Sequence, residues 1–175
     1  MPGPTPARSV EPPLPREVDG FRLLRELGRG GMGIVYQAEE LSSGRAIAHK
    51  VLATDELVSE EGFERFRRDA RMAASISDPR CVFVYGAHQV DGAPAIAMEL
   101  CPGETLEHRL GKRQPIPIET AVRWTLEILE GLEGAHAAGV LHRDVKPSNC
   151  FITHDEHVKV GDFGLSRSLD TDVRL

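Results

Sequence analysis

Four polar residues in the last third of the chain have the types and spacing of a phosphoryl-transfer site. Asp144, Lys146 and Asn149 lie within the segment HRDVKPSN (142–149), and Asp162 follows after twelve further residues. The Asp144 carboxylate could orient a hydroxyl and accept its proton, while Lys146 could neutralise charge on a transferred phosphoryl group. Asn149 and Asp162 supply the hard oxygen ligands that Mg²⁺ prefers. The spacing therefore predicts magnesium-dependent phosphoryl transfer.

A glycine-rich segment near the start of the chain could hold phosphate. Residues 28–35 read GRGGMGIV, which matches G-x-G-x-x-G-x-V between two expected strands. Glycine lets the backbone approach a phosphate chain closely and adopt positive φ. The pattern alone is weak, because a glycine-rich hairpin turn explains it equally well. A dinucleotide fold would need a helix after the glycines, and a P-loop would need a terminal Gly-Lys-Ser or Gly-Lys-Thr; neither is present.

Lys50 follows the small apolar residues 46–48 on the third expected strand. A lysine in this setting can enter a cleft and hold phosphate oxygens as a compact cation. A counter-charge would fix its direction, and Asp69 lies on the same face of the expected helix as Phe66 and Ala73. We therefore expect Lys50 to pair with Asp69.

The apolar strand 93–100 runs into a Pro-Gly link at 102–103. Such a junction leaves backbone N–H and C=O groups unpaired at the back of a cleft, where the edge of a purine could pair with them. In the context of the other motifs, residues 98–101 form a candidate adenine site.

The elements that position these residues change type along the chain. Strand signals dominate at 21–27, 34–39, 45–52, 81–88 and 93–100. One helix interrupts them, with a periodic face formed by Phe63, Phe66, Ala70, Ala73 and Ile76. Two helices at 104–110 and 119–138 follow, the second with a stripe formed by Val122, Leu126, Leu129, Leu132 and His136, and then a hairpin over 150–160. This order predicts an α+β fold: a five-stranded antiparallel sheet with one helix (20–100), then a helical part (104–175).

Composition narrows the class of protein further. Residues 1–19 contain six of the twelve prolines, so we expect a disordered, unpacked tail before a domain over 20–175. A formal net charge of −6 disfavours a general binder of nucleic acid or anionic membranes. No apolar run is long enough to span a bilayer and no signal peptide is recognisable, so we expect a cytoplasmic location. Cys81, Cys101 and Cys150 lack the spacing of a zinc or redox motif and are expected to be reduced.

Together these segments resemble the eukaryotic-like serine/threonine protein kinases of bacteria, over residues 21–175. The resemblance implies a protein-kinase-like fold that uses ATP and Mg²⁺ and phosphorylates Ser or Thr in protein substrates. It implies that Lys50 holds the α- and β-phosphates, that Asp144 is the base with Lys146 beside it, and that Asn149 and Asp162 bind magnesium. The residues it places around the nucleotide are Leu27, Gly28, Arg29, Gly30, Gly31, Met32, Gly33, Ile34, Val35, Ala48, Lys50, Asp69, Met98, Glu99, Cys101 and Phe151. Among these, the backbone of Glu99 and Cys101 would pair with adenine.

Several features qualify the resemblance. Asp69 and Phe151 stand where the family usually has glutamate and leucine, and the sequence ends at Leu175, before the Ala-Pro-Glu motif and the remaining helices of the carboxy-terminal lobe. We therefore expect an incomplete helical lobe with exposed apolar surface on 119–138. Arg143 implies a loop ordered by a phosphate on the activation segment, with candidate acceptors at Ser166, Ser168 and Thr171.

Two kinds of function remain open from the sequence. The first is a serine/threonine kinase that works with the rest of the lobe supplied by another segment. The second is a non-catalytic nucleotide-binding fragment that regulates another kinase. A scaffold that acts through its proline-rich tail is least favoured.

Overall fold

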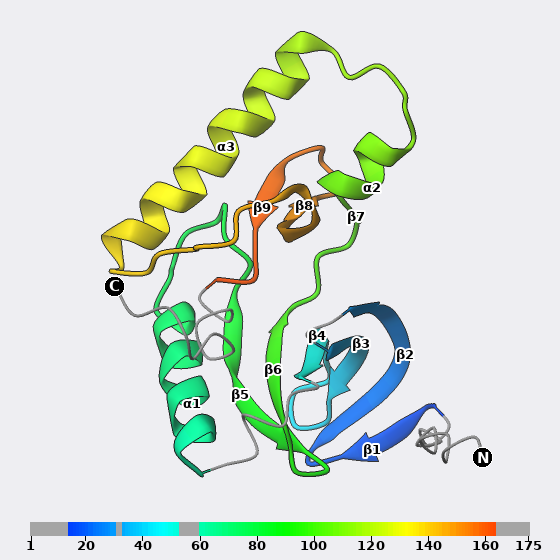
Figure 1. Cartoon of the computed structure of the whole chain (residues 1–175). Coiled ribbons are helices and arrows are strands. Elements are labelled where there is room, and N and C mark those ends of the chain that lie inside the picture. Colours follow the sequence, from blue (N-terminus) through cyan, green and yellow to red (C-terminus); the bar gives the residue numbers. More distant parts are fainter. Residues whose placement is uncertain (1–13, 31–32, 53–59, 164–175) are drawn as a thin grey trace, which may run out of the picture.

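A six-stranded antiparallel sheet forms the first part of the molecule. The computed structural model describes residues 14–30, 33–52 and 60–163 (Figure 1). The strands are β1 (Arg16–Val18), β2 (Phe21–Gly30), β3 (Gly33–Glu40), β4 (Arg45–Leu52), β5 (Val84–Val90) and β6 (Ala93–Glu99), in the order β1-β2-β3-β4-β6-β5. With the helix α1 (Glu60–Ala74), they make up what we call the sheet lobe. The predicted strands at 21–27, 34–39, 45–52 and 93–100 are confirmed.

The sixth strand, β1, corrects the expectation that residues 1–19 are unpacked. Arg16, Glu17 and Val18 pair with β2 after a tight turn. Asp19 and Gly20 make that turn with φ of 48° and 87°. These positive φ values fold the segment back onto Phe21. The proline-rich composition of residues 1–19 gave no sign of this short edge strand. Residues 1–13 of the expected tail lie outside the described residues.

The strand expected at 81–88 is shifted towards the carboxy terminus. Its ladder begins at Val84, whereas Cys81 forms an isolated parallel bridge with Val160. The Val82 N–H donates to the Val160 carbonyl at 2.8 Å, and the Val160 N–H donates to the Arg80 carbonyl at 2.7 Å. The segment 80–83 therefore joins the second half of the molecule before the chain enters the sheet.

Helix α1 packs on the sheet through the face that the sequence predicts. Phe66 is fully buried, and Ala70 and Ala73 are almost fully buried. Phe66 and Ala70 share one apolar core with Leu52 of β4 and Ile96 of β6. Burial of this face stabilises the packing of α1 on the sheet. Figure 1 shows α1 beside β5.

The second part, which we call the helical lobe, spans residues 104–163. It contains β7 (Glu104–Thr105), α2 (Leu106–Gly111), α3 (Ile118–Ala137), the 3₁₀ helix η2 (Pro147–Asn149), β8 (Cys150–Ile152) and β9 (Val158–Val160). The hairpin expected at 150–160 is confirmed. The helix expected from residue 104 begins at Leu106 instead, because Glu104 and Thr105 pair with β8 as a short strand.

Helix α3 buries a different face from its apolar stripe. The buried residues are Trp124, Glu127, Gly131 and Ala135. The Trp124 indole N–H donates to the Glu156 carbonyl at 2.9 Å, so this face is fixed by a polar contact as well as by packing. The expected exposed apolar surface is confirmed on three members of the stripe, since Val122, Leu126 and Leu129 are each more than half exposed. No helix within the described residues is long and apolar enough to cross a membrane.

Thr105 caps α2, and its loss is expected to weaken the helical lobe. Its side-chain oxygen accepts the His108 N–H at 3.2 Å. Thr105→Ala should lower the free energy of unfolding by about 1 kcal/mol, because a helix-end donor loses its partner. Thr125→Ala is the matched control: its exposed hydroxyl donates to the Ala121 carbonyl within the helix and caps nothing. Urea denaturation of both variants measures the difference, and equal losses would contradict the capping role.

Candidate active site

A cleft lies where the sheet lobe meets the helical lobe. Its first cavity has a volume of about 370 Å³ and is lined by Leu27, Gly28, Arg29, Val35, Ala48, Lys50, Val82, Met98, Glu99, Cys101, Thr105, Ser148, Phe151 and Asp162. A second cavity of about 370 Å³ shares five of these residues and extends to Gly30, Gly33, Lys146 and Asn149. The cleft therefore runs from the apolar end of β6 to the polar loop before β8.

The glycine segment forms the tip of the β2–β3 hairpin above the cleft. Gly30 pairs with Gly33 at the end of the ladder. Gly33 has a φ of 135°, and a Cβ there would lie 2.1 Å from the Val51 carbonyl oxygen, so only glycine fits. Gly31 and Met32 lie outside the described residues. The hairpin brings the backbone of Gly28, Gly30 and Gly33 over the cleft.

Lys50 forms an ion pair with Asp162, a partner that the sequence did not predict, and its expected pair with Asp69 stays a prediction. The Lys50 ammonium lies 2.8 Å from Asp162 Oδ2, and the two side chains are 9% and 26% exposed. Asp69 is half-buried on α1 and does not line the cleft. Lys50 lies on β4, between β3 and β6, and lines both cavities. Its charge therefore faces the cleft, close to Asp162, the residue expected to bind magnesium.

The loop 142–149 brings three of the expected catalytic groups together. The Lys146 ammonium lies 2.6 Å from Asp144 Oδ2. The hydrogen bond from Lys146 lowers the pKa of Asp144, and Asn149 and His142 act in the same direction. The Asn149 amide donates to the Asp144 carbonyl at 2.9 Å and to Oδ2 at 3.3 Å. Asp144 is thus an ionised carboxylate with a fixed orientation.

His142 ties this loop to the strand that precedes Asp162. The His142 ring is buried, and its Nε2 lies 2.8 Å from the Gly161 carbonyl. Its Nδ1 accepts the Asp144 N–H at 3.3 Å. The proton of the neutral ring is therefore assigned to Nε2. Arg143 and Asp162 have positive φ of 67° and 62°. Non-glycine residues adopt this region uncommonly, in turns and at functional sites.

The apolar end of the cleft is the segment that leaves β6. Met98 is buried beside Ala48 in the core of the sheet lobe, and Cys101 lies at the cavity wall. Burial raises the pKa of the Cys101 thiol to about 12. This cysteine is therefore a neutral, apolar lining group. Phe151 packs closely on Gly161, where a Cβ would lie 2.9 Å from the ring. The chemistry of this end suits a flat, largely apolar ligand.

Most residues that the sequence places at the site do meet in the cleft. Among the described residues, three are absent from the lining: Ile34 packs against the core on the other face of β3, Asp69 lies on α1, and Asp144 reaches the cleft only through its hydrogen bond with Asn149. The position of Ile34 follows from strand alternation: its neighbour Val35 faces the cleft, so Ile34 faces the opposite side of β3. Val82, Thr105 and Ser148 line the cleft but were missed. Ser148 lies between Lys146 and Asn149 in the loop 142–149, so its place in the sequence could have identified it.

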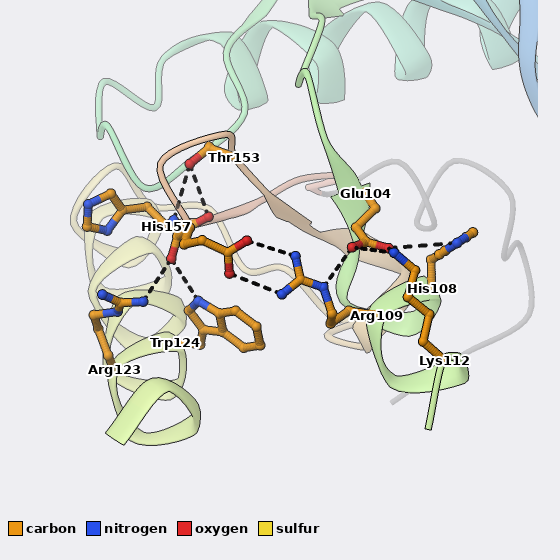
Figure 2. A network of polar contacts seen from close by, with 9 residues as sticks. Glu104, His108, Arg109, Lys112, Arg123, Trp124, Thr153 and His157 are labelled. Atoms are coloured by element: carbon orange, nitrogen blue, oxygen red, sulfur yellow. Dashed lines mark hydrogen bonds and ion pairs between the residues drawn. The ribbon is translucent and has the colours of Figure 1, made fainter. Parts of the chain in front are cut away.

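A polar network within the helical lobe joins its helices to its strands (Figure 2). Arg109 donates to Glu104 at 2.7 Å and to both carboxylate oxygens of Glu156 at 3.0 and 2.9 Å. Lys112 also binds Glu104, and together with Arg109 it lowers the pKa of Glu104 to about 2. The Arg109 guanidinium also lies 5.5 Å from the Trp124 ring centroid. The network joins α2 and α3 to the β8–β9 turn, and so supports the strands that flank the catalytic loop.

Comparison with known proteins identifies the family. The model of the protein kinase domain matches residues 21–175. The chain therefore belongs to the protein kinase family, and its bacterial relatives are serine/threonine kinases.

Two curated relatives and one solved structure illustrate the similarity. A probable serine/threonine-protein kinase of Streptomyces coelicolor is 41% identical over 161 residues, which are 89% of this chain and 24% of the relative. The probable kinase pknA2 of Bifidobacterium longum is 38% identical over 151 residues, which are 85% of this chain and 20% of the relative. The PknI kinase domain of Mycobacterium tuberculosis superposes with a TM-score of 0.77 at 29% identity, over 86% of this chain and 61% of that domain. The chain thus spans about a quarter or less of these two curated relatives.

Proposed function

We propose that this chain carries the nucleotide site and catalytic loop of a serine/threonine kinase, which transfers the γ-phosphate of ATP to hydroxyl groups of protein substrates. The observation that supports this most is that Lys50, Asn149 and Asp162 line one cleft and that Asn149 donates to the Asp144 carboxylate beside it. An enzyme that uses ATP acts where ATP is supplied, and we propose the cytoplasm as its compartment.

Asp144 would act as the base in this reaction. A substrate hydroxyl that donates to the Asp144 carboxylate would pass its proton to that group as its oxygen bonds to the γ-phosphorus. The bond between the γ-phosphorus and the bridging oxygen breaks, and ADP leaves. Lys146 lies beside Asp144 and lines the phosphate end of the cleft. Its charge would therefore stabilise the transferred group.

Lys50, Asp162 and Asn149 would hold the phosphates and the metal. Asp162 offers a carboxylate, and Asn149 donates its amide nitrogen to Asp144, so its amide oxygen is directed elsewhere. These oxygen donors fit Mg²⁺, which would neutralise phosphate charge when bound. The Lys50 ammonium is paired with Asp162 in this structure. With nucleotide bound, it would donate to the phosphate oxygens, either in place of Asp162 or together with it. The apolar end of the cleft would receive adenine between Val35, Ala48 and Phe151.

A specific observation favours a second candidate, a nucleotide-binding regulatory fragment. Lys50 is paired with Asp162, the residue proposed to bind magnesium. A site in which these two groups hold each other could bind nucleotide without supporting turnover. Transfer of phosphate and binding of nucleotide must therefore be measured separately.

Lys50→Met is the variant that tests the proposed function. The wild-type chain should transfer ³²P from Mg-ATP to a generic Ser/Thr protein substrate, and Mg-ATP should raise its melting temperature. Lys50→Met should bind Mg-ATP about tenfold more weakly, because a buried cation facing the phosphates is lost. Lys112→Met is the control, since Lys112 pairs with Glu104 and lines neither cavity of the cleft. Thermal stabilisation of the wild type without transfer would favour the regulatory fragment, and no stabilisation would contradict both.

A further inference from the structure

Besides Lys50–Asp162, a second ion pair joins the two lobes beside the cleft. The Lys159 ammonium lies 2.6 and 2.8 Å from the two carboxylate oxygens of Glu99. Glu99 is the last residue of β6 in the sheet lobe, and Lys159 is the middle residue of β9 in the helical lobe. Their side chains are only 23% and 17% exposed. Solvent therefore screens this pair less than a surface pair.

Phe83 strengthens the same junction. Its N–H donates to Glu99 Oε2 at 3.2 Å, and its carbonyl accepts the Glu99 N–H at 2.8 Å. The Lys159 ammonium lies 5.3 Å from the centroid of the Phe83 ring. That separation is within the range of a cation–π contact. The Glu99 carboxylate therefore accepts from a lysine of the helical lobe and from a backbone amide that precedes β5.

The pair joins the two segments that lead to the two ends of the proposed nucleotide site. Glu99 lines the apolar end of the cleft, where adenine would bind. Lys159 is three residues before Asp162, and the intervening Val160 is bonded through its backbone to Arg80 and Val82. A shift of β9 relative to β6 would thus change the distance between the adenine end and Asp162.

We propose that the Glu99–Lys159 pair is a positioning pair that sets the separation of the two lobes for nucleotide binding. This inference rests on the proposed function, because ATP is the ligand that would span the two ends. A ligand that contacts both ends binds more tightly when their separation is already fixed, since less freedom is lost on binding. The charge-assisted hydrogen bonds of Glu99 supply that restraint without touching the phosphates.

Charge-removing variants test the pair through nucleotide affinity. Lys159→Met keeps an unbranched side chain over Phe83 but removes the charge, and Glu99→Gln keeps an acceptor for the Phe83 N–H. Each should weaken Mg-ATP binding about threefold to tenfold, and the double variant should be no weaker than either single variant. Lys112→Met is the matched control, because it breaks an ion pair with Glu104 inside the helical lobe. Its affinity should stay within about twofold of wild type.

Hydrogen exchange in the nucleotide-free chain gives a second, independent measurement. Lys159→Met should speed exchange at the Glu99 and Val82 amides, whose bonds lie at the junction, whereas Lys112→Met should not. Unchanged exchange, unchanged or tighter nucleotide binding, or additive losses in the double variant would overturn the proposal. A wild-type chain that binds no nucleotide would refute the proposed function and the role in nucleotide binding, and exchange would still decide whether the pair restrains the junction.

Discussion

Replacing Asp144 with asparagine is expected to lower the rate of phosphoryl transfer from Mg-ATP to a protein substrate by about 10²- to 10⁴-fold. An amide has nearly the same shape as the carboxylate but cannot accept the hydroxyl proton. The pKa of Asp144 is lowered by the hydrogen bond from Lys146, so the wild-type group is ready to act as a base at neutral pH. Mg-ATP affinity should change by less than about threefold, because Asp144 does not line the cavities that would hold the nucleotide.

The comparison needs a variant with the same chemical change at another site. Asp155→Asn provides it, because Asp155 is exposed in the turn between β8 and β9. Initial rates at saturating Mg-ATP, measured with the wild type and both variants, separate the chemical step from binding. A rate for Asp144→Asn above about one tenth of wild type would remove Asp144 from the role of base.

The catalytic loop could be predicted from the sequence because its geometry is largely local. Asp144, Lys146 and Asn149 lie within six residues, and the turn of η2 is enough to bring Asn149 back to Asp144. The glycine hairpin is also local, since a single steric requirement at Gly33 accounts for it. Motifs whose parts are adjacent in sequence leave few alternative arrangements.

The partner of Lys50 could not be predicted in the same way. It depends on how α1 and the strand leading to Asp162 are placed around β4, which is a matter of long-range packing. Helical spacing pointed to Asp69 on α1, and no local pattern pointed to Asp162, whose Oδ2 lies 2.8 Å from the Lys50 ammonium. An ion pair between elements 112 residues apart follows from tertiary structure and from no local pattern.

Helix α3 shows a second limit of periodicity. Its exposed stripe and its buried face both recur at helical spacing, so the pattern alone does not say which one packs. Buried Glu127 decides the matter: one carboxylate oxygen accepts the Val158 N–H at 2.8 Å, and the other contacts His157. A charged residue that a hydropathy pattern assigns to solvent is therefore the one that attaches α3 to β9.

His49 is the least expected residue of the sheet lobe. It lies on β4 directly before Lys50 and is fully buried. Its ring is 4.6 Å from the Phe21 ring and 6.0 Å from that of His88, between centroids. Within the described part of the chain, neither of its ring nitrogens has a hydrogen-bond partner. Burial, with a smaller contribution from neighbouring His88, lowers the pKa of His49 to about 4.

His49→Val is accordingly expected to stabilise the protein, most strongly in mild acid. At pH 7 the free energy of unfolding should rise by about 1–2 kcal/mol, because two unsatisfied polar atoms are removed from the core. The ordinary pKa of a histidine is 6.5, so His49 binds a proton below that pH in the unfolded wild type. In the folded protein His49 binds this proton only below about pH 4. The wild type therefore loses up to about 3 kcal/mol over this window, and the variant avoids that loss.

Urea denaturation at several pH values between about 7 and 4.5 measures this effect as the difference in slope between wild type and variant. Other groups titrate in the same range, so the difference between the two curves, and not either curve alone, reports on His49. His154→Val is the matched control, because His154 is exposed in the β8–β9 turn, and its curve should run parallel to that of the wild type. A curve for His49→Val that is also parallel to wild type would show that His49 gains a partner or a proton in the folded state. Burial of His49 beside Lys50 would then add nothing to the pH dependence of the free energy of unfolding.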